Sequence, residues 1–564
     1  MIAKADPQSG SRGSIYLRSF VRRAFSSSYL AAEPAARAFI PVDFRDAGAR
    51  SAVTRAAAAR AVAPGVLAAL REQDARLPAS AARRRNIETL AGGGCAVVAT
   101  GQQVGLFLGP LYSFYKAASA VAVARALSRE AGVPCVPLFW LQTEDHDFAE
   151  IAACTVAGTD GAPATFSLRG DSAADEGRAS IAHRALGPEV TALLDALGEA
   201  LPSGEAAAEV LALLRAHYQP GRSLAGAFGG VMASLFADEG LIVLDPRVAA
   251  VAAAAAPIYE RVLERDAGIA GALTAQRDRL HAAGFDEQIA VRADCSLLFH
   301  HPRGAAGPRF RLQCPRDEHQ RWTLAGDGAA IASDTLLDRA RREPLAFSTS
   351  ALLRPIVQDS LLPTAAYVGG PGEINYFAQL PPLYSTLGAP MPLIVPRGRF
   401  RCIEARTRRL LLHLGLAPDD ASRTRAALAD RLPVDRPPGA PEPSALRRRA
   451  GETLAPALEA LLSDALAGDP SLARAAERTR ATVNRAVGRF LGRYERTLLA
   501  RDAVTTDRFE RLQAALCPGG VPQERAYSWP SLAARLGWRT LKNLVLENLE
   551  TTGPFATALR EIEP

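Results

Sequence analysis

The sequence predicts an α/β protein built on an open parallel β-sheet, with a long helical arm near the carboxyl end. The apolar runs CAVVAT (95–100) and VPCVPLFW (133–140) predict two buried strands, and residues 111–130 between them carry apolar side chains at helical spacing. Strand, helix and strand together form a βαβ unit. From 471 to 516, apolar residues recur at roughly heptad spacing, which predicts the arm.

The bulk composition is that of a globular protein. Of its 564 residues, 48% are hydrophobic and 22% charged, which is enough to bury a sizeable core. The net charge of +7 is carried almost entirely by arginine, with lysine only at Lys4, Lys116 and Lys542. Because no basic run is interleaved with aromatic residues, we expect no nucleic-acid partner.

The cysteines and the apolar runs bear on the compartment. Seven cysteines are scattered along the chain without a CxxC pair, which indicates reduced thiols and a cytoplasmic protein. No run reaches the roughly 18 apolar residues of a membrane span, so we expect no membrane partner. The Arg- and Ser-rich amino terminus has the composition of a transit peptide but no signal-peptide core, and we expect it to be disordered.

Changes in composition divide the chain into six predicted segments. The connecting insertion contains a strand-like GLIVLDP, and its alternating SLLFHH and RFRLQC predict a β-hairpin. The arm is predicted to be an antiparallel coiled coil with its tip near AGDPS and an apolar stripe of Leu472, Ala476, Val483, Val487, Phe490 and Tyr494. The segments are an N-terminal extension (1–30), the first part of the core (31–153), the insertion (154–344), the second part of the core (345–403), the arm (404–516) and a C-terminal segment packing on the core (517–564).

Polar motifs follow both predicted strands of the βαβ unit. TGQQVG follows the first strand and QTEDHD the second, so both are expected at the carboxyl edge of the sheet, where open α/β sheets bind ligands. Glu144, Asp145, His146, Asp147 and Glu150 suit general acid–base chemistry or oxygen ligation of Mg²⁺. The alternative is a polar loop whose aspartate caps the next helix.

The glycine-rich motif after the first strand is neither a P-loop nor a dinucleotide fingerprint. Its glycines can let backbone amides approach a ligand beside Gln102 and Gln103, or they can serve only a tight turn. Lys116 lies on the following helix beside Tyr112 and Tyr115. Because the chain uses arginine at almost every other basic position, this lysine has two explanations. Either the site requires a compact ammonium group, or the lysine was kept by chance on a solvated face of the helix.

Two further groups of residues were considered as sites. The turn Gly369–Gly370–Pro371–Gly372, followed by Glu373, can bind an anion or simply begin a helix. The second group is a set of possible zinc ligands: Cys295, His300, His301, Cys314 and His319. These residues lack the spacing of structural zinc sites, so we expect no metal there.

Four stretches together resemble the bacillithiol biosynthesis cysteine-adding enzymes. They are ATGQQVGLFLGPLYSFYKAASA, VPLFWLQTEDHDFAE, LLRPIVQDSLLPTAAYVGGPGEINYFAQL and PQERAYSWPSL, which occur in the family's order. The resemblance extends from about residue 39 to the C-terminus. It implies a Rossmann-type core with large connecting insertions, a coiled-coil arm that forms a homodimer, and a ligase joining L-cysteine to glucosaminyl malate through an amide bond.

The resemblance also implies which residues form the site. The roles within these motifs are our hypothesis: His146, supported by Glu144, Asp145 and Asp147, would deprotonate the cysteine ammonium for attack on an activated carboxylate, and Lys116 would neutralise that carboxylate or a phosphate leaving group. The residues expected to bind substrate or nucleotide are Thr100, Gly101, Gln102, Gln103, Gly109, Tyr112, Gly369, Gly370, Gly372, Glu373, Tyr376 and Gln379.

The energy source and the reaction class leave alternatives open. ATP with Mg²⁺ is expected to activate the carboxylate, through an adenylate or an acyl phosphate, although the chain has no conventional ATP motif. A nucleotidyltransferase on the same core and a non-catalytic coiled-coil scaffold are the competing hypotheses.

Overall fold

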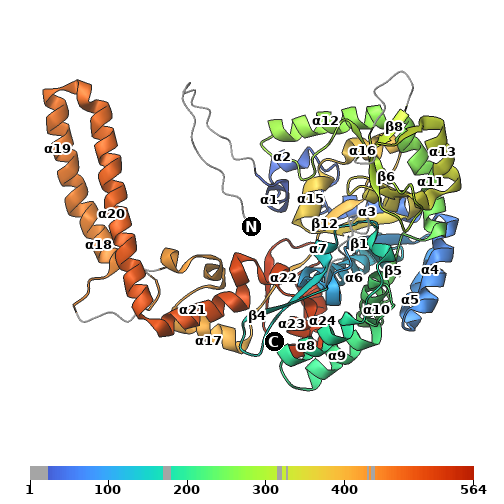
Figure 1. The fold of residues 1–564 in the computed structure, drawn as a ribbon, viewed down its shortest axis with the longest axis horizontal. Coiled ribbons are helices and arrows are strands. Elements are labelled where there is room, and N and C mark those ends of the chain that lie inside the picture. The colour runs from blue at the N-terminus through green and yellow to red at the C-terminus, as the bar shows by residue number, and fades with distance from the viewer. Residues whose placement is uncertain (1–22, 169–178, 314–320, 326–327, 429–430, 434–438) are drawn as a thin grey trace.

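The computed structural model describes residues 23–168, 179–313, 321–325, 328–428, 431–433 and 439–564. Its centre is a five-stranded parallel sheet in the order β12–β11–β1–β2–β5, which confirms the predicted fold class (Figure 1). The strands are β1 (Ala96–Gln102), β2 (Cys135–Leu141), β5 (Ile242–Leu244), β11 (Thr364–Gly369) and β12 (Leu393–Pro396).

The predicted βαβ unit is present. Its helix, α6 (Leu111–Ala131), ends at Gly132, whose φ of 69° is the left-handed conformation that glycine adopts easily. Strand β5 comes from the segment predicted as an insertion, so the central sheet draws a strand from residues 154–344.

Both faces of the central sheet are buried. On β2, Phe139 packs on Phe228 of α10 (Leu224–Leu235), with ring centroids 5.8 Å apart. The alternate side chains Leu138 and Trp140 belong instead to the hydrophobic cluster that contains Leu70 of α4 (Pro64–Arg76). Helices therefore cover the sheet on two sides, as a buried parallel sheet requires.

An antiparallel sheet in the order β10–β6–β7–β8–β9 lies near the carboxyl edge of the central sheet. The β6–β7 pairing confirms the predicted hairpin. The strands are β6 (Cys295–His300), β7 (Phe310–Gln313), β8 (Arg321–Leu324), β9 (Ala330–Ala332) and β10 (Phe347–Thr349).

Both ends of the described chain pack on the core. Phe25 of α1 (Phe25–Leu30) is fully buried against Phe39 and Phe285, so residues 25–30 are folded, contrary to the disorder predicted for the whole of 1–30. Residues 1–22 lie outside the described part. At the other end, β14 (Leu559–Ile562) pairs in parallel with β13 (Arg399–Cys402). The three helices that precede β14 are α22 (Gln523–Ala526), α23 (Trp529–Leu536) and α24 (Trp538–Thr551).

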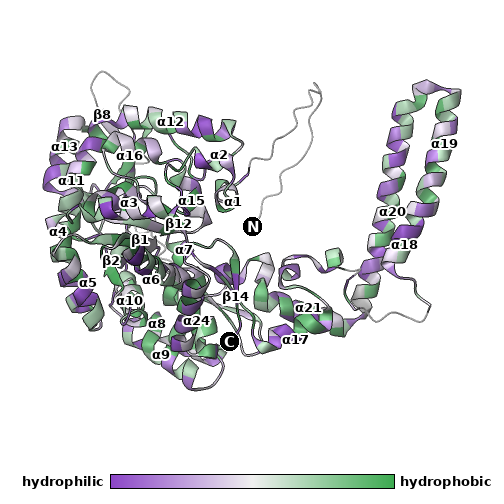
Figure 2. Cartoon of the chain, turned by 180° about the vertical axis from the view of Figure 1, so that it is seen from behind, coloured by the Kyte–Doolittle hydropathy of each residue, from purple (hydrophilic) through white to green (hydrophobic). Residues whose placement is uncertain are grey.

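The arm projects from the body as an antiparallel helical hairpin (Figure 1). Helices α18 (Pro443–Arg449) and α19 (Ala455–Gly468) run out, and α20 (Ala473–Arg501) returns, with the tip at the predicted AGDPS. The predicted single helix over 471–516 is divided, because Asp502 caps the separate helix α21 (Ala503–Leu516) by accepting from Thr505 N (2.9 Å). Figure 2 shows apolar residues along much of α19.

The remaining helices and strands complete the body. Among the residues that the structure describes, no helix combines the length and apolarity needed to cross a bilayer. The other elements are α2 (Pro34–Arg37), α3 (Ala47–Ala58), α5 (Ala81–Ala91), α7 (Phe148–Ile151), β3 (Ala153–Ala157), β4 (Pro163–Ser167), α8 (Glu189–Ala200), α9 (Glu205–His217), α11 (Ala249–Glu264), α12 (Asp266–Ala282), α13 (Ser333–Arg342), α14 (Arg354–Leu361), α15 (Pro371–Phe377), α16 (Pro381–Leu387) and α17 (Ala405–Leu414).

Candidate active site

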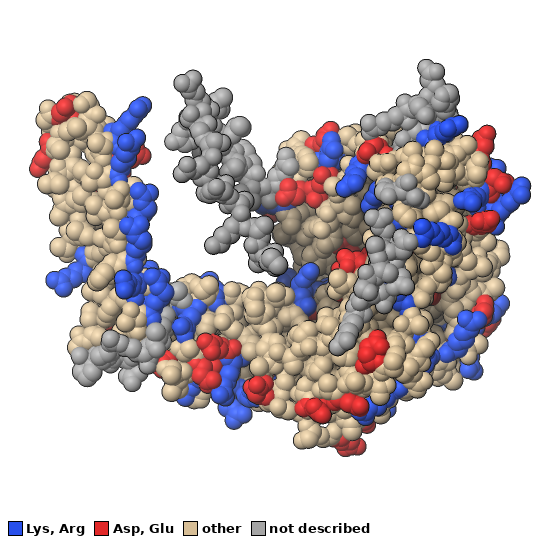
Figure 3. All heavy atoms as spheres, in the orientation of Figure 1, with Lys and Arg blue, Asp and Glu red and all other residues tan. Residues whose placement is uncertain are grey.

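A cavity of about 580 Å³ opens at the carboxyl ends of β1, β2 and β11. The sheet order extends from β1 through β2 to β5 on one side and through β11 to β12 on the other, so the cavity lies where open α/β sheets bind ligands. Figure 3 shows this face of the body hollowed. The cavity brings together most of the predicted site residues: Gln102, Gln103, Tyr112, Lys116, Glu144, Asp145, Gly370, Gly372, Glu373 and Tyr376.

Lys116 joins the first and third motifs. Its Nζ donates to Gly101 O and Gln102 Oε1, both at 2.8 Å, and forms an ion pair with Glu373. These three acceptors use all three N–H donors of an ammonium, so the geometry is that of the charged form. Burial alone would raise the pKa of Glu373, but Lys116 reverses the effect and holds it below the ordinary value. Lys116 therefore organises the strand ends, with each of its donors already engaged.

Glu144 supplies a buried carboxyl group to the cavity. Its Oε2 accepts from the hydroxyl of Thr349 at the end of β10. Burial raises the pKa of Glu144, although Arg247 and that hydroxyl partly oppose the shift. A carboxyl group with a raised pKa in a cavity is suited to taking up and releasing a proton.

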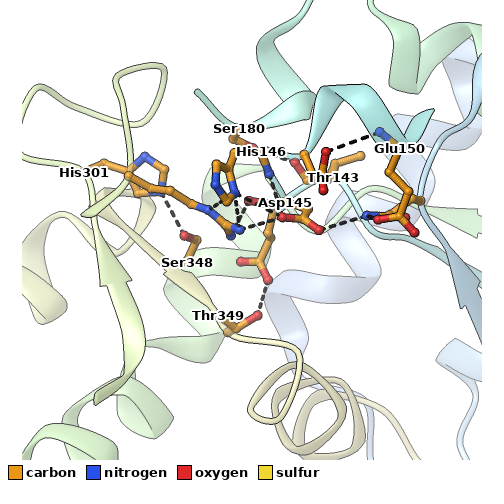
Figure 4. A network of polar contacts seen from close by, with 12 residues as sticks. Thr143, Asp145, His146, Glu150, Ser180, His301, Ser348 and Thr349 are labelled. Atoms are coloured by element: carbon orange, nitrogen blue, oxygen red, sulfur yellow. Dashed lines mark hydrogen bonds and ion pairs between the residues drawn. The ribbon is translucent and has the colours of Figure 1, made fainter. Parts of the chain in front are cut away.

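Asp145 has the opposite environment. Burial alone would raise its pKa, but hydrogen bonds from His146 and the charge of Arg309 hold it well below the usual range. Arg309 Nη2 donates to Asp145 Oδ1 (2.6 Å), and Gln103 Nε2 donates to Asp145 Oδ2 and Glu150 Oε2, each at 2.9 Å. Figure 4 shows Asp145 between His146 and Glu150. Asp145 is thus a fixed anion that holds the loop.

His146 lies beside the cavity rather than in its wall. Its ring is 41% exposed, and Arg309 Nε donates to its Nδ1 at 3.1 Å. The same nitrogen also lies 3.3 Å from Asp145 Oδ1, so Nδ1 faces both the guanidinium of Arg309 and the carboxylate of Asp145. The next residue, Asp147, caps α7 by accepting from Glu150 N (3.3 Å), the role that the loop alternative predicts.

The glycines of the first motif serve close packing. A Cβ on Gly101 would lie 2.8 Å from Trp140 O, and one on Gly105 would lie 2.8 Å from Gly109 Cα. Gly109 has a φ of 60° and does not line the cavity. Thr100 donates to Val368 O across the sheet (2.8 Å), away from the cavity. These four residues shape the turn that carries Gln102 and Gln103.

The third motif contributes to the cavity wall from α15. Glu373 accepts from Gly370 N (2.8 Å) and from Tyr367 Oη, which fixes its carboxylate toward Lys116. Gly369 and Gln379 do not line the cavity. Gln379 instead exchanges two hydrogen bonds with the backbone of Ile289, at 2.9 and 3.1 Å, and so holds a loop that does.

The residues considered for zinc do not assemble into a metal site among those described. His301 is bonded to Ser348 Oγ (2.9 Å) and Gly307 O (3.0 Å), which makes it a satisfied core residue (Figure 4). Cys314 and His319 lie outside the described residues.

Comparison with known proteins identifies the family. The model for "Bacillithiol biosynthesis BshC, N-terminal Rossmann-like domain" matches residues 15–398, and that for "Bacillithiol biosynthesis BshC, C-terminal coiled-coil domain" matches 443–556. The chain belongs to the BshC family.

The BshC relatives match over most of their length. A protein of Koribacter versatilis (strain Ellin345) named "Putative cysteine ligase BshC" is 36% identical over 85% of this chain and 87% of that relative. A protein of the same name from Salinibacter ruber (strain DSM 13855 / M31) is 33% identical over 86% of this chain and 87% of that relative. The family match confirms the resemblance drawn from the four motifs, and with it the Rossmann-like core and the coiled-coil arm.

Several cavity residues were missed from the sequence. Arg309, Arg354 and Arg397 line the cavity although they lie far apart in the chain, and Thr349 and Trp140 line it too. Arginine is so frequent here that none of the three could be recognised individually. Arg354 does lie within the LLRPIVQDS stretch that carries the resemblance, which was the one available signal.

Proposed function

We propose that the chain is a ligase that joins L-cysteine to glucosaminyl malate through an amide bond in bacillithiol biosynthesis, with ATP and Mg²⁺ as co-substrates. The observation that supports this most directly is the cavity at the sheet's carboxyl edge, which holds a buried carboxyl group among arginines in a chain of the BshC family. Relatives carry the name cysteine ligase.

The charges of the cavity wall support anionic substrates. Seven cationic side chains line it against five acidic ones. Cysteine, malate and nucleotide all bear carboxylates or phosphates, which arginine binds well. The cationic residues are Lys116, Arg292, Arg309, Arg311, Arg354, Arg397 and Arg525; the acidic residues are Glu144, Asp145, Glu150, Asp266 and Glu373.

We assign the proton transfer to Glu144. Amide formation requires that a carboxylate oxygen be phosphorylated or adenylated by ATP and that an amine attack the carbonyl carbon. The ammonium group must first give up a proton to become that amine, and phosphate or AMP leaves when the amide bond forms. Glu144 lines the cavity and has a raised pKa, whereas Nδ1 of His146 accepts from Arg309 outside the wall. His146 remains the competing base.

The test is mass spectrometry of the full chain incubated with glucosaminyl malate, L-cysteine, ATP and Mg²⁺. We expect a product whose mass is the sum of cysteine and glucosaminyl malate less one water, and fragmentation shows which amine was acylated. Release of AMP indicates an adenylate and release of ADP an acyl phosphate. Pyrophosphate release that does not consume cysteine would overturn the proposal in favour of a nucleotidyltransferase.

We also propose that the protein is a homodimer joined through the arm and that it acts in the cytoplasm. Leu461 and Phe490 on the arm are 67% and 68% exposed, so both offer apolar surface that a second arm can bury. Six cysteines are free among the described residues, in keeping with a reducing compartment.

A further inference from the structure

Arg354 is a buried cation in the cavity wall with part of its binding capacity unused. It begins α14 and is only 6% exposed. Its Nη2 donates to Tyr376 Oη (2.7 Å) and Tyr367 Oη (3.3 Å). Its Nη1 is buried and finds no acceptor among the residues that the structure describes.

The other buried cations of the wall have carboxylate partners. Lys116 pairs with Glu373, Arg397 Nη2 lies 2.7 Å from Glu524 Oε1, and Arg309 Nη2 lies 2.6 Å from Asp145 Oδ1. Within the described chain, no carboxylate lies within 4.0 Å of the Arg354 guanidinium. The carboxylate of Glu373 nearby is already shared with Lys116.

The phenols that face Arg354 do not neutralise it. Burial raises the pKa of both Tyr367 and Tyr376, so each is an uncharged hydroxyl at neutral pH. A guanidinium remains charged at this pH. The wall therefore holds one buried cation that no carboxylate contacts directly, since the nearby Glu373 is paired with Lys116, and an anionic ligand can pair with this cation.

The same cavity offers another free donor and open space. Trp140 Nε1 is buried in the cavity wall and also lacks an acceptor among the described residues. Gly372 also lines the cavity, and a Cβ built on it would meet nothing within 4 Å. A donor-rich, open cavity with a cation that no carboxylate contacts is complementary to an anionic group.

We propose that the Arg354 guanidinium anchors an anionic group of a substrate, a carboxylate or a phosphate. The proposal rests on the proposed function, because that function supplies the three candidate anions: the carboxylate of L-cysteine, the malate of glucosaminyl malate and the phosphates of ATP. Removing a charge-assisted hydrogen bond should weaken binding of the anchored substrate about 10- to 150-fold.

The experiment is calorimetric titration of the full chain with the three substrates and with counterparts that lack the anionic group, namely cysteamine, glucosamine and adenosine. Arg354→Gln should weaken the binding of one anionic substrate by the stated factor and leave the binding of its counterpart unchanged. The substrate whose binding is weakened identifies the anion. Arg215→Gln is the matched control, because Arg215 forms an exposed ion pair with Asp195 on α8, outside the cavity wall. Equal affinities of wild type and Arg354→Gln for all three substrates would overturn the proposal.

A second measurement avoids dependence on the folding of Arg354→Gln. Wild-type Trp140 fluorescence, isolated by subtraction of Trp140→Phe, is titrated with L-malate, inorganic phosphate and neutral diethyl malate. A saturable change in Trp140 fluorescence with either anion supports Arg354 as the anchor if the change is abolished in Arg354→Lys and absent with the ester. An unchanged signal with both anions contradicts it. Turnover by the wild type is measured separately, so a failed ligase assay with intact anion binding refutes the proposed function and not the anchor.

Discussion

At the scale of single residues, two adjacent carboxyl groups have environments that shift their pKa values apart. Burial raises the pKa of Glu144, while His146 and Arg309 outweigh burial at Asp145 and lower its pKa. Neighbouring carboxyl groups separated in this way often divide the roles of proton carrier and fixed charge. Adjacency in the sequence predicted a common location for the two, but their difference depends on Arg309, which lies 164 positions away.

This difference predicts unequal effects of two substitutions. Glu144→Gln should lower kcat about 10²- to 10⁴-fold, the usual contribution of a general base, and His146→Gln should lower it less than 10-fold. Because the base must be deprotonated, activity should rise with pH. The midpoint of that rise should lie above about 4.3, the ordinary pKa of a glutamate. Product formation measured from pH 4 to 9 checks this. Loss of kcat in His146→Gln alone would return the role to the histidine.

At the scale of elements, the turn after β1 depends on two glycines that touch. Gly105→Ala would place its Cβ 2.8 Å from Gly109 Cα, so we expect the free energy of unfolding to fall by about 1–3 kcal/mol. Gly268→Ala in α12 is the control, because nothing lies within 4 Å of its Cβ and alanine favours a helix by about 1 kcal/mol. Urea denaturation of both variants checks this. Equal stability of Gly105→Ala and wild type would contradict the packing.

The elements that sequence alone predicted are those specified locally. The βαβ unit and the β6–β7 hairpin depend on nearby residues and on apolar periodicity. The place of β5 in the central sheet could not be predicted, because three residues carry too short a pattern and their partner, β2, lies about a hundred positions earlier. The division of the 471–516 helix likewise depends on one capping residue, Asp502, inside an otherwise continuous heptad pattern.

At the scale of the whole molecule, buried histidines make stability depend on pH. Burial lowers the pKa of His217 and His300 to about 4 and that of His301 to about 3. Below pH 6.5 the unfolded chain binds protons that the folded chain does not, so stability falls as pH falls. At pH 5 each of these histidines should lower the free energy of unfolding by roughly 1–2 kcal/mol relative to its value at pH 7.5. Urea denaturation at the two values should show a smaller difference for His301→Gln than for wild type; an unchanged difference would contradict this.

The arm provides the test of assembly for the whole molecule. Its outgoing helices α18 and α19 are joined to the returning α20 by Arg447 and Glu495 (2.7 Å) and by Arg480 and Glu459 (2.5 Å), so charged pairs align the hairpin. Few apolar side chains are buried within it, and Leu461 is left 67% exposed. A second copy covering the exposed part of this leucine on both arms would contribute about 2–4 kcal/mol, since full burial of one leucine contributes about 1.5–3 kcal/mol and Leu461 is 67% exposed.

We therefore expect Leu461→Glu to dissociate a dimer that the wild type forms. The matched control is Leu412→Glu on α17, because Leu412 is 75% exposed and lies outside the projecting hairpin formed by α18, α19 and α20, so it introduces the same charge at a similarly exposed leucine. Sedimentation velocity at micromolar concentration should give a dimer for wild type and Leu412→Glu and a monomer for Leu461→Glu. A monomeric wild type would refute pairing through the arm. A dimer that persists in Leu461→Glu would place the contact elsewhere on the molecule, and its sensitivity to Leu412→Glu would then identify α17 as the alternative surface.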